Sequence, residues 1–103
     1  MDFDKYQKEA FETAMESSQN IFYMTMGLCG EAGEIANKVK KVMRDAKSPD
    51  REDLKKELGD CLWYVAGMAT VLGIELSDIA DTNLVKLKSR KDRGVIGGSG
   101  DNR

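Results

Sequence analysis

Apolar residues recur every three or four positions along most of this chain, which is the spacing of one face of a helix. Strand-like alternation of apolar and polar residues is absent, helix-forming residues dominate, and proline occurs once, at position 49. Because the period of the apolar pattern decides which element can bury one face, the sequence predicts an all-α fold. We expect four helices over about residues 2–17, 21–46, 49–72 and 77–92, followed by a glycine-rich tail.

The two central helices carry the clearest apolar seams. The seam of 21–46 consists of Leu28, Ala32, Ile35, Val39, Val42 and Ala46, and that of 49–72 of Leu54, Leu58, Cys61, Val65, Met68 and Leu72. Seams of this kind are typical of helices that pack against one another or against a partner helix. A chain of 103 residues buries only about two-thirds of its unfolded surface, so we expect a homodimer or homotetramer to complete the core.

Helix-capping and turn residues predict where the helices begin and end. Ser48 fits an N-cap with Pro49 in the first helical position, and Ser77 fits the N-cap of the last helix. Gly73 fits a left-handed position after the third helix. We expect one domain over residues 1–93 and a tail over 94–103 that is either disordered or folded over bound phosphates of the same or a neighbouring subunit.

Composition excludes several classes of function. The chain has no histidine, which excludes Ser-His-Asp and Cys-His catalysis and any zinc site that needs imidazole. A formal net charge of −2 disfavours a nucleic-acid polymer as a partner, because such binding depends on neutralising phosphates. No signal peptide and no membrane-spanning run of apolar residues are present, so we expect a cytoplasmic protein without a membrane partner.

Acidic residues form a second stripe beside each central seam. Glu31 and Glu34 lie one turn apart on the first of these helices, and Glu57 and Asp60 on the second. If the helices pack by their seams, four carboxylates face each other, and a cation would relieve their repulsion. A set of hard oxygen ligands favours Mg²⁺, with Mn²⁺ as a substitute. The same spacing is also typical of a solvated helix face.

Lysines follow the first acidic pair on the same helix. Lys38 and Lys41 lie one and two turns beyond Glu34 and can offset the charge of a phosphate-bearing substrate. The acids and lysines together favour a substrate that brings phosphate oxygens to the metal.

Two motifs resemble those of the MazG-like nucleoside triphosphate pyrophosphohydrolases. The first is G-L-C-G-E-A-G-E over residues 27–34 followed by K-K at 40–41, and the second is E-L-G-D-C-L-W-Y over residues 57–64. The segment N-L-V-K-L at 83–87 and the closing G-S-G-D-N-R at 98–103 also look like the short members. The resemblance covers nearly the whole chain, although some members carry a doubled acid where Gly30 precedes Glu31 here.

The resemblance implies a four-helix MazG-like bundle that hydrolyses (deoxy)nucleoside triphosphates between the α and β phosphates. The products would be a nucleoside monophosphate and pyrophosphate. The biological role would be nucleotide-pool sanitation or control. It implies that the two acidic pairs hold the metal, that Glu34 can orient or deprotonate the attacking water, and that the phosphate contacts come from Lys38, Lys41, Asn83 and Lys86. The alternatives are a non-catalytic helical interaction module and a dUTPase-like pyrophosphatase with narrow base choice.

Overall fold

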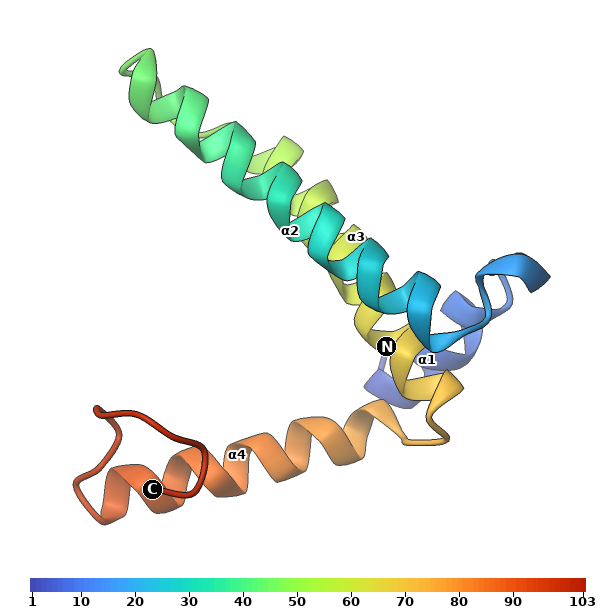
Figure 1. The fold of residues 1–103 in the computed structure, drawn as a ribbon, viewed down its shortest axis with the longest axis vertical. Helices are drawn as coiled ribbons and strands as arrows, with labels where there is room; N and C mark the ends of the chain where they lie inside the picture. Colours follow the sequence, from blue (N-terminus) through green and yellow to red (C-terminus); the bar gives the residue numbers. More distant parts are fainter.

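The computed structural model describes residues 1–103 and is entirely helical (Figure 1). The elements are α1 (Phe3–Phe11), the short 3₁₀ turn η1 (Glu16–Ser18), α2 (Ile21–Arg44), α3 (Arg51–Val71) and α4 (Leu76–Asp92). The prediction of an all-α chain with four helices is confirmed.

Helices α2 and α3 form a long antiparallel hairpin whose apolar core lies at one end. Met24 on α2 is fully buried and packs against Gly67 on α3, where an added Cβ would come within 2.6 Å of the methionine sulfur. Ala66 and Ala69 are buried at the same level. Small residues on α3 therefore let the two helices approach closely at this end of the hairpin.

Helix α1 packs across this end of α3. The Trp63 indole N–H lies 2.9 Å from the Thr13 hydroxyl and 3.2 Å from the Ala10 carbonyl oxygen. Asp2 caps the start of the helix by accepting from the Lys5 amide. The predicted helix over 2–17 was too long, because the Thr13 hydroxyl donates to the Ala10 carbonyl and the chain turns away after Phe11.

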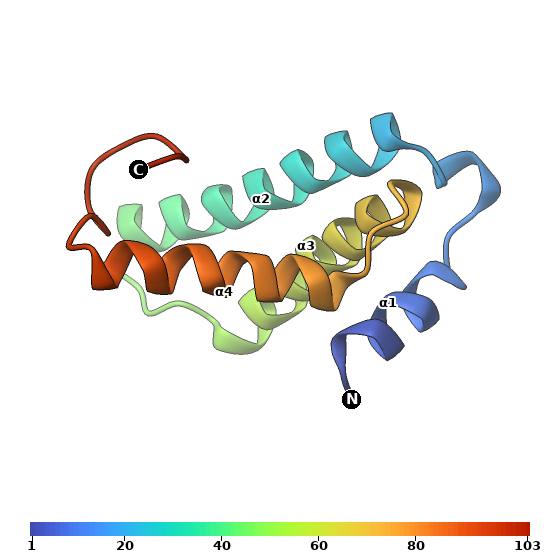
Figure 2. The ribbon, with the colours of Figure 1, turned by 90° about the horizontal axis from the view of Figure 1, so that it is seen from below.

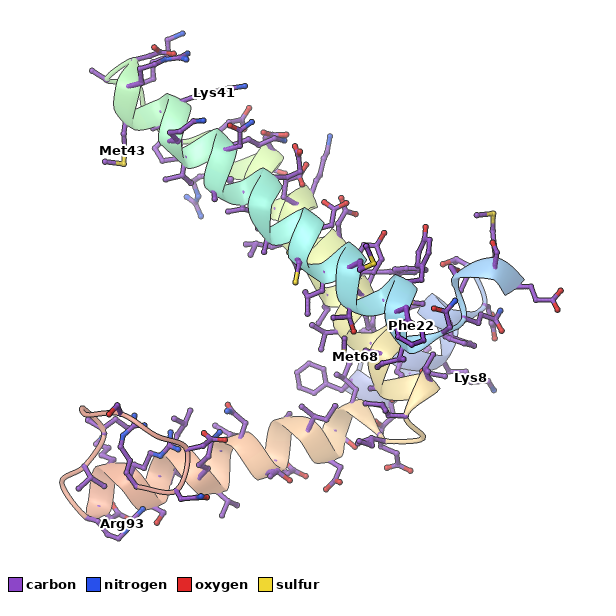
Figure 3. The ribbon with its side chains drawn as sticks, in the orientation of Figure 1. Lys8, Phe22, Lys41, Met43, Met68 and Arg93 are labelled. Atoms are coloured by element: carbon purple, nitrogen blue, oxygen red, sulfur yellow. The ribbon has the colours of Figure 1, made fainter.

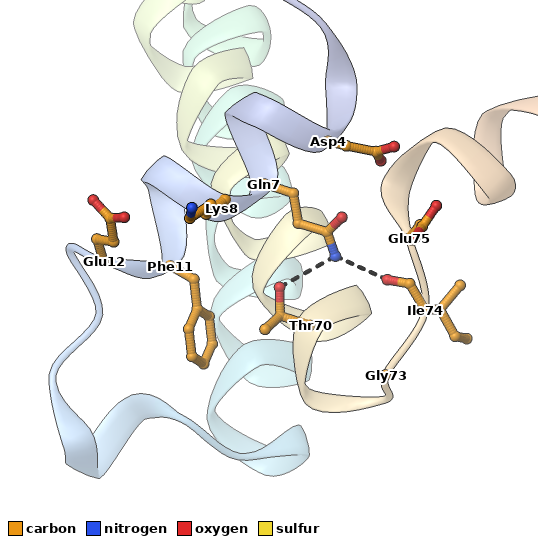
Figure 4. A pocket seen from close by; sticks show the side chains of 9 residues that line it. All are labelled: Asp4, Gln7, Lys8, Phe11, Glu12, Thr70, Gly73, Ile74 and Glu75. Atoms are coloured by element: carbon orange, nitrogen blue, oxygen red, sulfur yellow. Dashed lines mark hydrogen bonds between the residues drawn. The ribbon is translucent and has the colours of Figure 1, made fainter.

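The α3–α4 corner is stabilised by side chains from α1. The helices meet at a bend of 104°, and Gly73 adopts the predicted left-handed conformation with φ of 71°. Figure 4 shows Gln7 reaching from α1 to the Thr70 hydroxyl and the Ile74 carbonyl. The Gln7 amide oxygen also accepts from the Leu76 amide at 2.8 Å, so it satisfies one of the open amides in the first turn of α4.

Two predicted helix starts were wrong. The N-cap of α4 is Glu75 rather than Ser77, whose amide and hydroxyl both donate to Asp4 of α1. The N-cap of α3 is Asp50 rather than Ser48, because the Asp50 carboxylate accepts from two amides of the first turn and its charge suits the helix N-terminus.

Within one chain the four helices do not close into a bundle. Figure 1 shows α4 extending away from the α2–α3 hairpin beyond the corner, and Figure 2 gives the view from below. The radius of gyration is 16.3 Å, against about 13 Å for a compact chain of this length. Only 7 of 103 residues are buried, and many large apolar side chains are exposed. No single helix is both long and apolar enough to cross a membrane; α3 and α4 pass that test only together, across their bend.

Part of each predicted seam belongs to this open surface. Leu58 is 61% exposed and Leu72 is 55% exposed, and Val39 and Ala32 are also exposed. Figure 3 shows Met43 projecting from the far end of α2, where it has no packing partner. The seams are therefore only partly covered inside one chain. The half-buried members are Leu28, Ile35, Val42, Leu54, Cys61, Val65 and Met68.

The tail folds back along α4. Asp101 accepts from the Lys86 ammonium at 3.0 Å and from the Arg90 guanidinium at 3.0 Å, and Arg90 is buried beneath it. The Arg103 guanidinium donates to four backbone carbonyls of the tail, which closes residues 95–103 into a loop.

Candidate metal centre

The contact between α2 and α3 changes from apolar to charged along the hairpin. Next to the Met24–Gly67 contact, the Tyr64 ring lies over Gly27, where any added Cβ would overlap it. One turn further, Glu31 replaces these small and apolar groups in the space between the helices. Glu31 and Glu57 thus lie in the helix–helix contact itself, and not beside it as the predicted seams required.

Three carboxylates meet at this level of the hairpin. Oxygen atoms of Glu31, Glu57 and Asp60 lie within 4.8 Å of one another, and we call these three residues the acid cluster. Glu31 and Glu57 are half-buried between the helices, whereas Asp60 is exposed. The register places all three together because Glu57 and Asp60 are one turn apart on α3 and face Glu31 on α2.

The acid cluster is electrostatically strained without a cation. Burial raises the pKa of the Glu31 carboxyl, and the neighbouring carboxyl groups of Glu57, Asp60 and Glu34 raise it further. The Glu57 Oε2 atom is buried and has no hydrogen-bond partner. A group of hard oxygen donors with an unsatisfied buried atom fits a divalent metal ion such as Mg²⁺.

Glu34 stands apart from the other predicted metal ligands. It lies one turn beyond Glu31 on α2, but its side chain is exposed and it is not among the three clustered carboxylates. The structure thus brings together three of the four predicted acids and leaves Glu34 at the rim of the cluster, near enough for its charge to act on Glu31.

Lys38 is held between two carboxylates of α3. Its ammonium lies 2.8 Å from Asp53 Oδ2 and 2.9 Å from Asp53 Oδ1, and it donates to Glu57 Oε1 at 3.0 Å. The hydrogen bonds that Lys38 donates to Asp53 and then to Glu57 raise the pKa of its ammonium group. Lys41, by contrast, is exposed near the far end of α2 and makes no ion pair (Figure 3).

Asn83 and Lys86 lie on α4, away from the acid cluster of the same chain (Figure 1). Asn83 is exposed, and Lys86 is paired with Asp101 of the tail. One chain alone therefore does not bring these two predicted phosphate ligands to the acids.

Two residues near the cluster were not among the predicted site residues. Asp53 holds Lys38, and it lies four residues before Glu57 on the same helix face, so helical spacing could have identified it. Tyr64 lies close enough to the cluster for Glu31 and Asp60 to raise the pKa of its phenol, after the larger effects of burial and Tyr23. The i, i+4 spacing of Asp60 and Tyr64 in the sequence could have indicated that these two side chains are neighbours on α3.

A surface hollow of about 600 Å³ lies between α1 and the α3–α4 corner (Figure 4). Its lining includes Gln7, Phe11 and Ile74 but no residue of the acid cluster. The polar groups of Gln7 that face it are already bonded to Thr70 and the corner backbone, so this region has a structural role.

Sequence comparison identifies the family of the chain. Residues 19–95, which include the whole acid cluster, match the MazG nucleotide pyrophosphohydrolase domain. The chain belongs to the MazG family. The Gene 37 protein of Mycobacterium phage L5 is 53% identical over the full length of both chains. The Bacillus subtilis (strain 168) protein YvdC is 28% identical over 86% of this chain and 92% of its own. No solved structure matches the chain.

MazG domains are generally metal-dependent, and the acid cluster lies within the part of the chain that matches them. The arrangement of the three carboxylates can accept a metal ion between α2 and α3. The family thus gives a chemical reason for charged residues at a position where helices normally bury apolar side chains.

Proposed function

We propose that this MazG protein is a Mg²⁺-dependent nucleoside triphosphate pyrophosphohydrolase. It cleaves the substrate between the α and β phosphates, releases a nucleoside monophosphate and pyrophosphate, and serves nucleotide-pool sanitation or control. The observation that carries the proposal is the convergence of Glu31, Glu57 and Asp60 inside the MazG-matching segment.

Glu31, Glu57 and Asp60 would hold the metal, with Glu34 joining them from the rim. Mg²⁺ is the expected ion and Mn²⁺ a substitute, because every donor is a carboxylate oxygen. When bound, the ion supplies positive charge that neutralises the carboxylates and polarises the substrate's phosphate oxygens. The unpartnered Glu57 Oε2 and the raised pKa of Glu31 support this assignment.

Glu34 is proposed to orient the attacking water and to accept its proton. The water oxygen forms a bond to the α-phosphorus, and the bond to the bridging oxygen breaks as pyrophosphate leaves with the electron pair. Glu34 suits this role because its carboxylate is exposed at the edge of the cluster and makes no ion pair with a lysine or arginine. No histidine is needed for this reaction.

Lys38, Lys41, Asn83 and Lys86 were predicted from the sequence to contact phosphate. Lys41 is unpaired and can do so directly, whereas Lys86 would have to exchange Asp101 for phosphate. Because Asn83 and Lys86 lie on the diverging α4, we propose that α4 of a second copy brings them to the acid cluster.

A homo-oligomer, dimer or tetramer, is supported by the open apolar surface. The chain exposes 7,591 Å², about 1,800 Å² more than a compact monomer of this mass. A standard interface removes about 800 Å² from each partner, so the excess is large enough for extensive association. Sedimentation velocity on the purified chain tests this, and a monomer at micromolar concentration would contradict it.

The decisive test of the activity is pyrophosphate release from a panel of canonical and modified triphosphates, with and without Mg²⁺. We expect Mg²⁺-dependent release that Glu34→Gln and Asp60→Asn abolish. Turnover of dUTP alone would favour the dUTPase-like alternative with narrow base choice. Unchanged release in both variants would overturn the proposal.

A non-catalytic helical interaction module is the rival class, and the exposed seams would suit it. That class expects solvated acids, whereas Glu31 and Glu57 are half-buried between two helices. Thermal melting separates the two: Mg²⁺ should raise the melting temperature of a protein whose clustered acids bind it, and should leave a solvated acidic face almost unaffected.

A further inference from the structure

Glu57 presents its two carboxylate oxygens to different surroundings. Oε1 accepts from the Lys38 ammonium at 3.0 Å, whereas Oε2 is buried and has no partner. Lys38 is itself fixed by both oxygens of Asp53, at 2.8 and 2.9 Å. The side chain of Glu57 is only 16% exposed, so it has little room to turn and exchange the two oxygens.

We propose that Lys38, anchored by Asp53, sets the metal selectivity of the acid cluster by leaving Glu57 a single free oxygen. The inference rests on the proposed function, because it concerns the metal site of that function. It assigns Lys38 as a positioning residue that acts through Glu57, in place of the phosphate contact expected from the sequence.

The physical reason lies in how two common divalent cations use carboxylates. Mg²⁺ takes six ligands in a small octahedron and accepts one oxygen from each carboxylate, while Ca²⁺ takes six to eight ligands and often binds both oxygens of one carboxylate. A charge-assisted hydrogen bond on Oε1 opposes two-oxygen binding by Glu57. The Asp53–Lys38–Glu57 arrangement therefore disfavours Ca²⁺ relative to Mg²⁺.

Isothermal titration of Mg²⁺ and of Ca²⁺ into the full chain, without nucleotide, tests this inference. For Lys38→Met we expect the ratio of the Ca²⁺ to the Mg²⁺ association constant to rise about tenfold, the scale of one hydrogen bond to a charged group. Lys40→Met is the matched control, because Lys40 lies on the same helix, is exposed and makes no ion pair. Its ratio should equal that of the unmodified protein.

The Asp53→Asn variant separates the positioning effect of Lys38 on Glu57 from the effect of net charge on metal affinity. Removing Lys38 takes away a positive charge and removing the Asp53 carboxylate takes away a negative one, so the absolute affinities should move in opposite directions. The Ca²⁺ to Mg²⁺ ratio should nevertheless rise in both variants. Lys38→Met removes the donor that occupies Glu57 Oε1, and Asp53→Asn removes the anchor that holds this donor in place. Glu52→Gln, on an exposed neighbour whose only ion pair is a loose one with Lys55 at 3.8 Å, is the control for this variant.

An unchanged ratio in Lys38→Met, or an equal change in Lys40→Met, would overturn the inference and leave the proposed metal site intact. Failure of the unmodified protein to bind either ion would instead overturn the metal site itself. Should Lys38→Met be too unstable to titrate, circular dichroism will show it, and the ratio measured in Asp53→Asn then decides.

Discussion

The two ends of the α2–α3 hairpin are held together by opposite kinds of contact. Near α1, Met24 and Gly67 pack without solvent, and Trp63 ties α1 to the same level. Further along, the helices face each other through Glu31, Glu57 and the Lys38 ion pairs. Apolar burial stabilises the first region, whereas clustered like charges oppose folding in the second until a cation arrives.

The apolar end of the hairpin therefore stabilises the fold, whereas the charged end carries the proposed chemistry. Substitutions at the apolar end should lower the free energy of unfolding. Removal of the Glu31 or Asp60 carboxylate, neither of which is paired with a lysine, should lower activity while leaving the metal-free protein at least as stable.

The largest expected effect on stability is at Met24. Met24→Ala should lower the free energy of unfolding by about 3 kcal/mol, because it leaves a cavity in a fully buried position. Urea denaturation at fixed protein concentration measures the loss. Met43→Ala is the control, since Met43 is 78% exposed and its removal should change stability by less than about 0.5 kcal/mol. Equal losses in both would show that the apolar end is not the core.

At the charged end, Asp60→Asn should reduce Mg²⁺-dependent pyrophosphate release by about a hundredfold or more, because several kcal/mol of charge stabilisation depend on the ion. The melting temperature without Mg²⁺ should stay the same or rise, since one repelling charge is gone. Asp81→Asn, at an exposed and unpaired site on α4, should leave both quantities unchanged. A strongly destabilised but active Asp60→Asn would reverse the proposed division of the hairpin.

A smaller effect is expected at the α1–α4 contact. Gln7→Ala should destabilise the protein by about 1–2 kcal/mol, because the Leu76 amide loses the side chain that satisfies it. Lys8→Ala, on the exposed next residue, is the matched control. Hydrogen exchange at the first turn of α4 should increase only in the Gln7 variant, and no increase there would contradict the capping role.

The smallest effect is a pH dependence at Glu31. Its pKa is raised above the ordinary 4.5 in the folded protein, so the folded state binds the proton more tightly than the unfolded state. Stability of the metal-free protein should therefore fall as pH rises from about 4.5 through the raised pKa. Melting curves from pH 4 to 7 test this, and saturating Mg²⁺ should remove the decline. Glu31→Gln should lack it, and an identical decline in that variant would assign it to another group.

Local sequence signals predicted helices well and their ends less well. The apolar period and Gly73 predicted four helices and one left-handed turn, because both depend on neighbouring residues only. Ser77 failed as an N-cap because Asp4, seventy-three residues earlier, bonds its amide and hydroxyl. Such a contact depends on the path of the whole chain and leaves no signal at the helix itself.

The candidate site was likewise predicted in part from local sequence spacing and in part was not. Spacing identified the acids, and the structure brings Glu31, Glu57 and Asp60 together. The pairing of Lys38 with Asp53 and Glu57 was not foreseen, since it depends on how α2 is rotated and shifted against α3. Spacing also placed the acids beside the packed seams, whereas the seams are only partly covered and Glu31 and Glu57 lie in the helix–helix contact.

By itself, the sequence determined the all-α fold, the positions of the helices and the set of residues able to hold a metal. Those properties follow from the 3.6-residue period and from side-chain chemistry, which are both local. Only the tertiary structure decided which acids converge, which lysine is already paired, and how far α4 diverges from the hairpin. These depend on contacts between residues far apart in sequence. The absence of a side chain at Gly27 and Gly67 lets α2 and α3 approach, and the bend at the α3–α4 corner directs α4.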